Sequence, residues 1–242
     1  MGSQRSILLD VDGTLVDSNY LHVDAWSQAF SGRGYSVAAW RIHRAIGMGG
    51  DKLLGELLGE RTAAELGDAL GDDHDRLVDR RIGEVRPLPG AVPLLRELHE
   101  LGYTVVLASS ARGSEIERYL DLLDARDVVD VWTTSDDVDR TKPDPDLLQV
   151  AIERAGVPAL AMVGDAVWDC RAATNAGLPC LAVRSGGVAD CELLAAGARQ
   201  VFDDAEDLLR AIRLGETACV RALPAQMITP SVQGRRPSEY RD

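Results

Sequence analysis

Short apolar runs alternate with amphipathic stretches along most of the chain. The runs have the length of buried strands, and the stretches between them repeat their apolar positions at helical spacing. This pattern predicts six strands, at residues 7–9, 104–108, 128–133, 159–163, 179–183 and 200–202. Because helices separate most of these strands, the pattern predicts an α/β fold with a doubly wound, Rossmann-like parallel sheet.

The predicted helices fall into two groups. Five belong to the alternating part of the chain, at residues 91–101, 115–123, 146–155, 168–176 and 205–214. Four follow the first strand with no convincing strand between them, at residues 22–30, 37–46, 51–58 and 63–83. We therefore expect a core domain of residues 1–16 and 87–214, interrupted by a helical domain of residues 17–86. Residues 215–242 are rich in proline and arginine, and we expect a disordered tail.

Composition narrows the function classes. The chain has 242 residues and a net charge of −13, which opposes nucleic acid or an anionic membrane as a partner. Four cysteines show no zinc-binding spacing, so we expect free thiols in a reducing compartment. We find neither an apolar run of membrane-spanning length nor a signal region. We therefore expect a soluble, cytoplasmic protein.

Two carboxylates stand at the end of the first predicted strand. Alternation along the chain points Asp10 and Asp12 to the same side, which is unfavourable unless a cation or a proton lies between them. Gly13 then permits a tight turn. A divalent metal with oxygen ligands, Mg²⁺, is the simplest solution.

Further polar residues follow other predicted strands. Ser109 follows residues 104–108, Asp165 follows residues 159–163, and Lys142 lies in the loop after residues 128–133. The carboxyl ends of parallel strands share one edge of a sheet, so these side chains are expected to face one pocket. Acids, a hydroxyl and an ammonium around a metal suit phosphoryl transfer. Lys142 and Lys52 are also the only lysines, which favours a specific need for an ammonium at each.

These segments resemble the four ordered motifs of the haloacid dehalogenase (HAD) superfamily. The motifs are Asp10-Val11-Asp12-Gly13-Thr14, Ser109 after an apolar strand, Lys142-Pro143-Asp144-Pro145, and Gly164-Asp165 with Asp169 four residues on. The helical insertion resembles the small α-helical cap of the phosphoglycolate phosphatase-like and β-phosphoglucomutase-like members.

The resemblance implies a role for each motif residue. Asp10 is expected to be the nucleophile, and Asp12 the general acid and base. Mg²⁺ is expected to bind the Asp10 carboxylate, the Asp12 backbone carbonyl and Asp165. The phosphoryl oxygens would bind Ser109, Ser110 and Lys142, and Asp169 would support the site by orienting Lys142 or a metal-bound water.

The cap offers weaker candidates. His22 and Lys52 are candidate substrate contacts, and Gly47-Met48-Gly49-Gly50 reads as a flexible loop of the kind that a lid needs. Trp40 and Met48 are predicted to lie in the core of the cap.

The favoured function is a Mg²⁺-dependent phosphatase of a small phosphorylated metabolite. A β-phosphoglucomutase-like mutase is the main alternative, although Gly49-Gly50 stands where that family places an arginine, for which Arg41, Arg44 or Lys52 would have to substitute. A phosphonoacetaldehyde hydrolase with Lys52 as the reactive amine, and a non-catalytic phosphate-binding protein, are further alternatives. The sequence defines neither the ester nor the oligomeric state.

Overall fold

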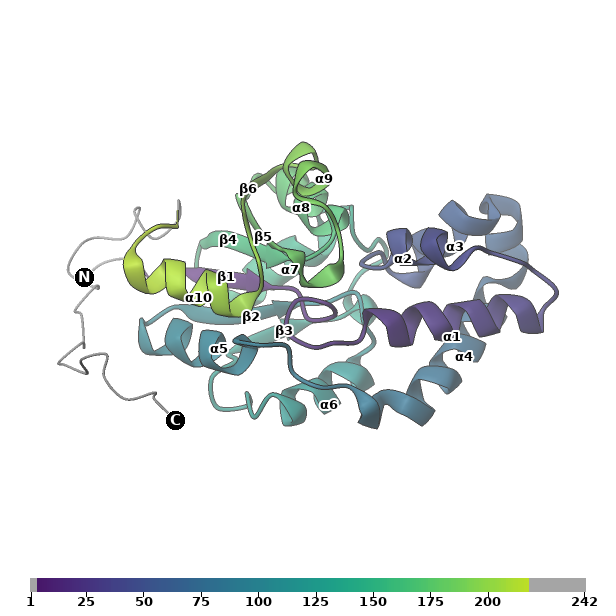
Figure 1. Cartoon of the computed structure of the whole chain (residues 1–242), viewed down its shortest axis with the longest axis horizontal. Helices are drawn as coiled ribbons and strands as arrows, with labels where there is room; N and C mark the ends of the chain where they lie inside the picture. The colour runs from purple at the N-terminus through teal and green to yellow at the C-terminus, as the bar shows by residue number, and fades with distance from the viewer. Residues whose placement is uncertain (1–3, 218–242) are drawn as a thin grey trace, which may run out of the picture.

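The computed structural model describes residues 4–217, and its centre is a six-stranded parallel sheet (Figure 1). The strand order is β3-β2-β1-β4-β5-β6. The strands are β1 (Ser6–Leu9), β2 (Thr104–Ala108), β3 (Val131–Thr133), β4 (Ala159–Gly164), β5 (Cys180–Val183) and β6 (Ala198–Phe202). The direction in which the chain adds strands to the sheet reverses between β1 and β4. Folds of this kind bind ligands beside the carboxyl ends of the strands at such a reversal, which here means the ends of β1 and β4.

Alternate strand residues pack into two separate apolar layers. Leu9 and Leu107 face a layer formed with helices α5 (Ala91–Glu100), α6 (Gly113–Leu122) and α10 (Ala205–Leu214). Leu8 and Val106 face the opposite layer, formed with α7 (Asp146–Ala155), α8 (Val167–Asn175) and α9 (Asp190–Ala195). Both faces of the central strands are therefore covered, which is why these strands read as continuous apolar runs. The predicted doubly wound α/β fold is confirmed.

Four helices between β1 and β2 form a helical insertion at one end of the molecule (Figure 1). They are α1 (Asn19–Gly32), α2 (Ala39–Ala45), α3 (Gly50–Leu58) and α4 (Glu60–Arg81), and a short 3-10 turn (Ile82–Glu84) ends the insertion. They enclose an apolar cluster of their own around Trp26, Phe30, Ile42, Leu53 and Leu70. This insertion has the place and the composition of a cap, and we use that name for it below.

The segment that leaves the core for the cap and the segment that returns from it lie side by side and are joined by backbone hydrogen bonds. The Asp17 amide donates to the Arg86 carbonyl at 2.9 Å, and the Leu88 amide donates to the Leu15 carbonyl at 2.9 Å. Two extended segments thus connect the cap to the core, a geometry that permits hinge movement. The domain boundaries after residues 16 and 86 stay a prediction, and residues 218–242 of the expected tail lie outside the described residues.

Several local predictions differ from the structure. The strand predicted at residues 128–133 is confined to Val131–Thr133, and the six-residue helix α9 was not predicted. Trp40 is 66% exposed, so its placement in the cap core is wrong, because Ile42 and Ala45 form the buried face of the short helix α2. Met48 is half-buried against the cap cluster.

Cys170 and Cys180 are buried free thiols and Cys191 is an exposed one. Among residues 4–217, the helices lack the combination of length and apolar character that crossing a bilayer requires.

Candidate active site

The loop after β1 places Asp10 at the centre of the molecule. The Asp10 amide donates to the Val163 carbonyl at 2.9 Å, which continues the pairing with β4, and the side chain is buried. Gly13 then turns the chain with φ of +74°, and a Cβ at this position would collide with Asn19 and Asp165. The turn therefore requires glycine for both its backbone angle and its close approach to Asp165.

Lys142 reaches this carboxylate from the loop before α7. Its Nζ lies 2.5 Å from Asp10 Oδ1 and 2.8 Å from Asp169 Oδ1, and its side chain is fully buried. Burial alone would lower the pKa of Lys142, but Asp10 and Asp169 outweigh burial and raise that pKa. The ammonium therefore stays charged beside Asp10.

Asp165 completes the cluster from the end of β4. Its carboxylate accepts hydrogen bonds from Thr14 Oγ1 at 2.9 Å and from Asn19 Nδ2 at 3.0 Å. Burial, together with the nearby Asp169, raises the pKa of Asp165 to about 7. A side chain at Gly186 would collide with this carboxylate, so the backbone passes directly beside it.

The arrangement fits a bound divalent cation. Oxygens of Asp10, Asp165 and Asp169 all lie within 4.8 Å of one another, and all three residues are buried. Burial, with Asp169 and Asp165 nearby, also raises the pKa of Asp10 against the opposing effect of Lys142. Three buried carboxylates around one ammonium leave an excess of negative charge, and carboxylate oxygens are the ligands that Mg²⁺ prefers.

Asp12 stands apart from this cluster and faces the cap. Its Oδ1 accepts a hydrogen bond from Ser18 Oγ at 2.5 Å and lies 3.3 Å from His22 Nε2. Burial acts to raise the pKa of Asp12, but the hydrogen bonds from His22 and Ser18 outweigh it and lower that pKa. Burial likewise acts to lower the pKa of His22, and Asp12 outweighs it and raises that pKa. Together they form an imidazolium–carboxylate pair that holds one proton.

A hydrogen-bonded chain continues from this pair into helix α4. His22 Nδ1 lies 3.1 Å from His74 Nε2, and His74 Nδ1 lies 2.9 Å from Asp75 Oδ1. Burial lowers the pKa of His74 to about 4, so this second imidazole is neutral at physiological pH. Sequence reasoning missed His74, because nothing in the sequence sets the rotation of α4 against α1.

Ser109 and Ser110 follow strand β2 next to the cap. Ser109 is fully buried and its Oγ accepts the Ala111 amide at 3.0 Å, whereas Ser110 Oγ donates to the Gly47 carbonyl at 3.3 Å. Ser110 therefore joins the core to the loop that the sequence suggested as a lid. The phosphate-binding roles of both serines stay predictions, as does the metal role of the Asp12 carbonyl.

A cavity of about 210 Å³ lies between the core and the cap over these residues. Asp10, Asp12, His22 and Ser110 line its reactive end, while Trp26, Met48 and Leu53 form an apolar wall. Lys52 is absent from the lining, because its ammonium pairs with Asp144 at 2.8 Å. The structure thus brings one of the two cap candidates, His22, to the cavity.

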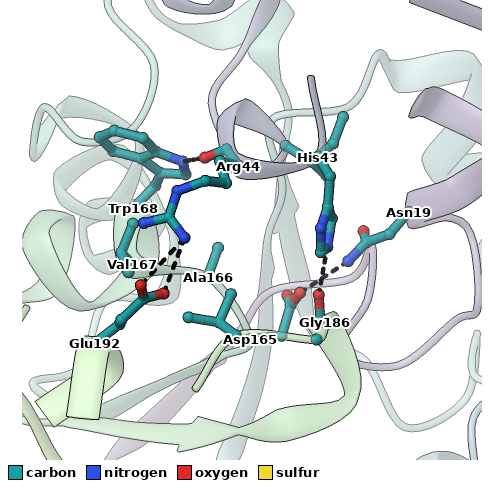
Figure 2. A pocket seen from close by; sticks show the side chains of 12 residues that line it. Asn19, His43, Arg44, Asp165, Ala166, Val167, Trp168, Gly186 and Glu192 are labelled. Atoms are coloured by element: carbon teal, nitrogen blue, oxygen red, sulfur yellow. Dashed lines mark hydrogen bonds and ion pairs between the residues drawn. The ribbon is translucent and has the colours of Figure 1, made fainter. Parts of the chain in front are cut away.

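A second, smaller pocket marks the other side of Asp165, on the seam between cap and core (Figure 2). Its volume of about 60 Å³ has room for about two water molecules. Figure 2 shows contacts that cross the seam: His43 Nε2 lies 2.8 Å from the Gly186 carbonyl, and Arg44 pairs with Glu192 at 3.1 Å. The cap is therefore seated on the core directly beside Asp165.

Residues 4–177 match the family of haloacid dehalogenase-like hydrolases. This chain belongs to that family and is an enzyme of the hydrolase class.

Known proteins agree with this assignment. A hydrolase from Pseudomonas syringae has a similar structure, with a TM-score of 0.82 and 36% identity over 89% of this chain and 100% of that one. A phosphoglycolate phosphatase from Vibrio parahaemolyticus is 30% identical over 71% of this chain and 80% of its own length. A validoxylamine A 7'-phosphate phosphatase from Streptomyces hygroscopicus is 29% identical over 64% of this chain and 74% of its own length.

Proposed function

We propose that this protein is a Mg²⁺-dependent phosphatase that hydrolyses a small-molecule phosphate monoester through an aspartyl-phosphate on Asp10. The observation that carries the proposal is the buried cluster of Asp10, Lys142, Asp165 and Asp169, which three segments distant in sequence bring together. The names of the two curated relatives, both phosphatases of small phosphorylated molecules, support it.

In the first step an Asp10 carboxylate oxygen attacks phosphorus. A bond between Asp10 and phosphorus forms while the bond from phosphorus to the ester oxygen breaks. The ester oxygen leaves as an alcohol by taking the proton that Asp12 and His22 hold between them. Lys142, 2.5 Å from Asp10, supplies positive charge where the phosphoryl oxygens arrive.

In the second step water hydrolyses the phosphorylated Asp10. Asp12 now accepts the proton of the attacking water, and the bond between Asp10 and phosphorus breaks to release inorganic phosphate. The lowered pKa of Asp12 keeps it ionised for this role, and the return of one proton to the pair with His22 restores the starting state.

Asp10 and Asp165 would hold Mg²⁺ together with the Asp12 carbonyl, and Asp169 would orient Lys142. The ion would neutralise the charge of the carboxylates and of the phosphate so that two anions can approach each other.

The alternative functions find less support in the geometry. The arginines that would have to bind a second phosphate in a mutase lie elsewhere, since Arg44 pairs with Glu192 and Arg41 lines an outer groove beside Trp40. Lys52, the amine that a phosphonoacetaldehyde hydrolase would need, pairs with Asp144 outside the cavity.

Hydrolysis of p-nitrophenyl phosphate with and without Mg²⁺ tests the proposal. We expect activity that requires Mg²⁺ and falls at least about 10³-fold in Asp10→Asn. Asp139→Asn, which removes the same charge from an exposed loop, should retain wild-type activity. Turnover by Asp10→Asn at the wild-type rate would contradict the nucleophile assignment.

A further inference from the structure

His22, the proposed partner of Asp12 in proton transfer, contacts a second histidine on its other side. His22 Nε2 lies 3.3 Å from Asp12 Oδ1, and His22 Nδ1 lies 3.1 Å from His74 Nε2. The centres of the two imidazole rings are 5.3 Å apart and their planes differ by 21°, so the rings meet edge to edge. Both histidines are buried. Which nitrogen of each ring carries a proton therefore decides what His22 presents to Asp12.

The tautomer of His74 follows from its other neighbour, Asp75. Asp75 Oδ1 lies 2.9 Å from His74 Nδ1. An ionised carboxylate only accepts hydrogen bonds, so His74 Nδ1 donates to it. Burial lowers the pKa of His74 to about 4, and a neutral imidazole has one donor and one acceptor. His74 Nε2 is therefore the acceptor, and His22 Nδ1 donates to it.

This acceptor fixes the nitrogen through which His22 exchanges its proton. The Nδ1 proton stays in the bond to His74, so the proton that goes to the leaving ester oxygen comes from the Nε2 side, where Asp12 lies. The ester oxygen then becomes an alcohol and His22 becomes a neutral imidazole with a lone pair on Nε2, to which the next proton returns. Without an acceptor at Nδ1, either nitrogen of neutral His22 could carry its single proton.

The packing around His74 also fixes the orientation of its ring. The indole of Trp26 stacks on this imidazole, with ring centres 4.2 Å apart and planes 19° apart, and Trp26 is itself buried. Asp75 Oδ2 lies 3.3 Å from Nε of Arg112, which precedes α6 in the core, whereas both histidines belong to cap helices. The hydrogen-bonded chain therefore begins and ends on core residues and is complete only while the cap is seated.

We propose that His74 is a positioning residue, which keeps the Nδ1 proton of His22 in place and thereby directs the exchangeable proton of His22 to Nε2, beside Asp12. This inference rests on the proposed phosphatase function and assigns to it a residue that acts through His22.

The tautomer of His74 is the first test, and it uses the wild-type protein. Long-range ¹H–¹⁵N correlation spectra at neutral pH, with the imidazole signals assigned through the backbone of each histidine, report which ring nitrogens carry protons. We expect His74 to be neutral with its proton on Nδ1. A proton on Nε2 of His74 would overturn the inference, because that nitrogen could then not accept from His22.

Two aryl esters test the effect on catalysis. Phenyl phosphate and p-nitrophenyl phosphate are similar in shape, but phenolate, whose conjugate acid has a pKa of about 10, needs a proton to leave far more than p-nitrophenolate does. His74→Phe keeps an aromatic ring against Trp26 and removes both nitrogens. It should lower kcat/KM for phenyl phosphate at least about tenfold more than for p-nitrophenyl phosphate.

Two further variants separate positioning from structure. His74→Gln places an amide oxygen near the position of Nε2, so its losses for the two esters should agree within about threefold. His99→Phe, at an exposed position of α5, should leave the ratio of the two kcat/KM values unaltered. Equal losses for both esters in His74→Phe would overturn the role of His74, because a merely structural effect acts on both esters alike.

The outcomes separate the two proposals. Absence of ester turnover in the wild type would overturn the phosphatase and, with it, this role of His74. Wild-type turnover with equal losses in His74→Phe would overturn the role of His74 alone.

Discussion

The ionisation of the proposed nucleophile, Asp10, depends on the charged groups around its carboxyl. Asp10 is buried with two further acids and one ammonium, so its ionised form is costly without additional positive charge. Asp12 lies two residues away in a different setting, where Ser18 and His22 stabilise its charge. Two neighbouring carboxyls are thus driven to different pKa values in the metal-free protein, and the proposed nucleophile, Asp10, would need the positive charge of a metal ion to ionise readily.

His22 should control the pH dependence of turnover. In the wild type the proton for the leaving group is lost only above the raised pKa of His22, so kcat/KM should fall at alkaline pH. In His22→Asn the proton resides on Asp12 alone, a carboxyl, so this fall should begin at lower pH, and kcat should drop about 10- to 100-fold.

Profiles of kcat/KM against pH measure both effects. His99→Asn, at an exposed position of α5, is the matched control and should follow the wild-type profile. An alkaline limb that stays in place in His22→Asn would exclude the imidazole as the proton store.

At the scale of elements, the loop between α2 and α3 joins the cap to the segment that carries Lys142. The Gly49 amide donates to Thr141 Oγ1 at 3.0 Å, and Thr141 Oγ1 in turn donates to Asp51. Thr141 is buried, so these bonds are shielded from water. The Thr141 hydroxyl is therefore one of the links between the cap and the segment that carries Lys142, beside the ion pair of Lys52 with Asp144.

Thr141→Val should weaken substrate binding. It removes both hydrogen bonds and leaves the buried Gly49 amide without its acceptor, which disfavours the seated cap. We expect KM to rise about fivefold to tenfold while kcat changes less. Glu192→Gln breaks the more exposed pair with Arg44 on the same seam and should change KM less than about twofold. Equal effects of the two variants in steady-state kinetics would argue against a special role for Thr141.

The sequence predicted the strands and the residues at their ends well, since buried parallel strands have a distinctive apolar pattern. It therefore anticipated the meeting of Asp10, Lys142 and Asp165. The ion pair of Arg112 with Asp75 was not predicted, because nothing in the sequence sets where α4 lies relative to the start of α6. The prediction for Trp40 was wrong for a related reason. A large apolar side chain is buried only when it lies on the helix face that packs against the rest of the protein, and Trp40 lies on the other face.

At the scale of the whole molecule, repulsion among the buried carboxylates destabilises the metal-free folded protein, and a bound metal ion would reduce that repulsion. Asp165 has its pKa raised from 3.8 to about 7 in the folded protein. The folded state therefore binds this proton more tightly than the unfolded state, and the free energy of unfolding of the metal-free protein should fall as pH rises from about 4 to about 7.

Mg²⁺ should therefore stabilise the protein more at pH values above about 7 than at about pH 5, where protons compete with it. Thermal unfolding with and without Mg²⁺ at both pH values measures the difference. In Asp165→Asn the metal-dependent increase in Tm should be largely lost at both. An equal increase in the variant would place the metal elsewhere.

The most direct test of the account is to observe the phosphorylated aspartate. Asp12→Asn retains the nucleophile but lacks the base for the second step, so acid quenching during turnover of p-nitrophenyl phosphate with Mg²⁺ should trap the intermediate. Mass spectrometry of the digested protein should then find one phosphoryl group on Asp10. A phosphoryl group on another residue, or ester turnover with unmodified Asp10 throughout, would contradict the account.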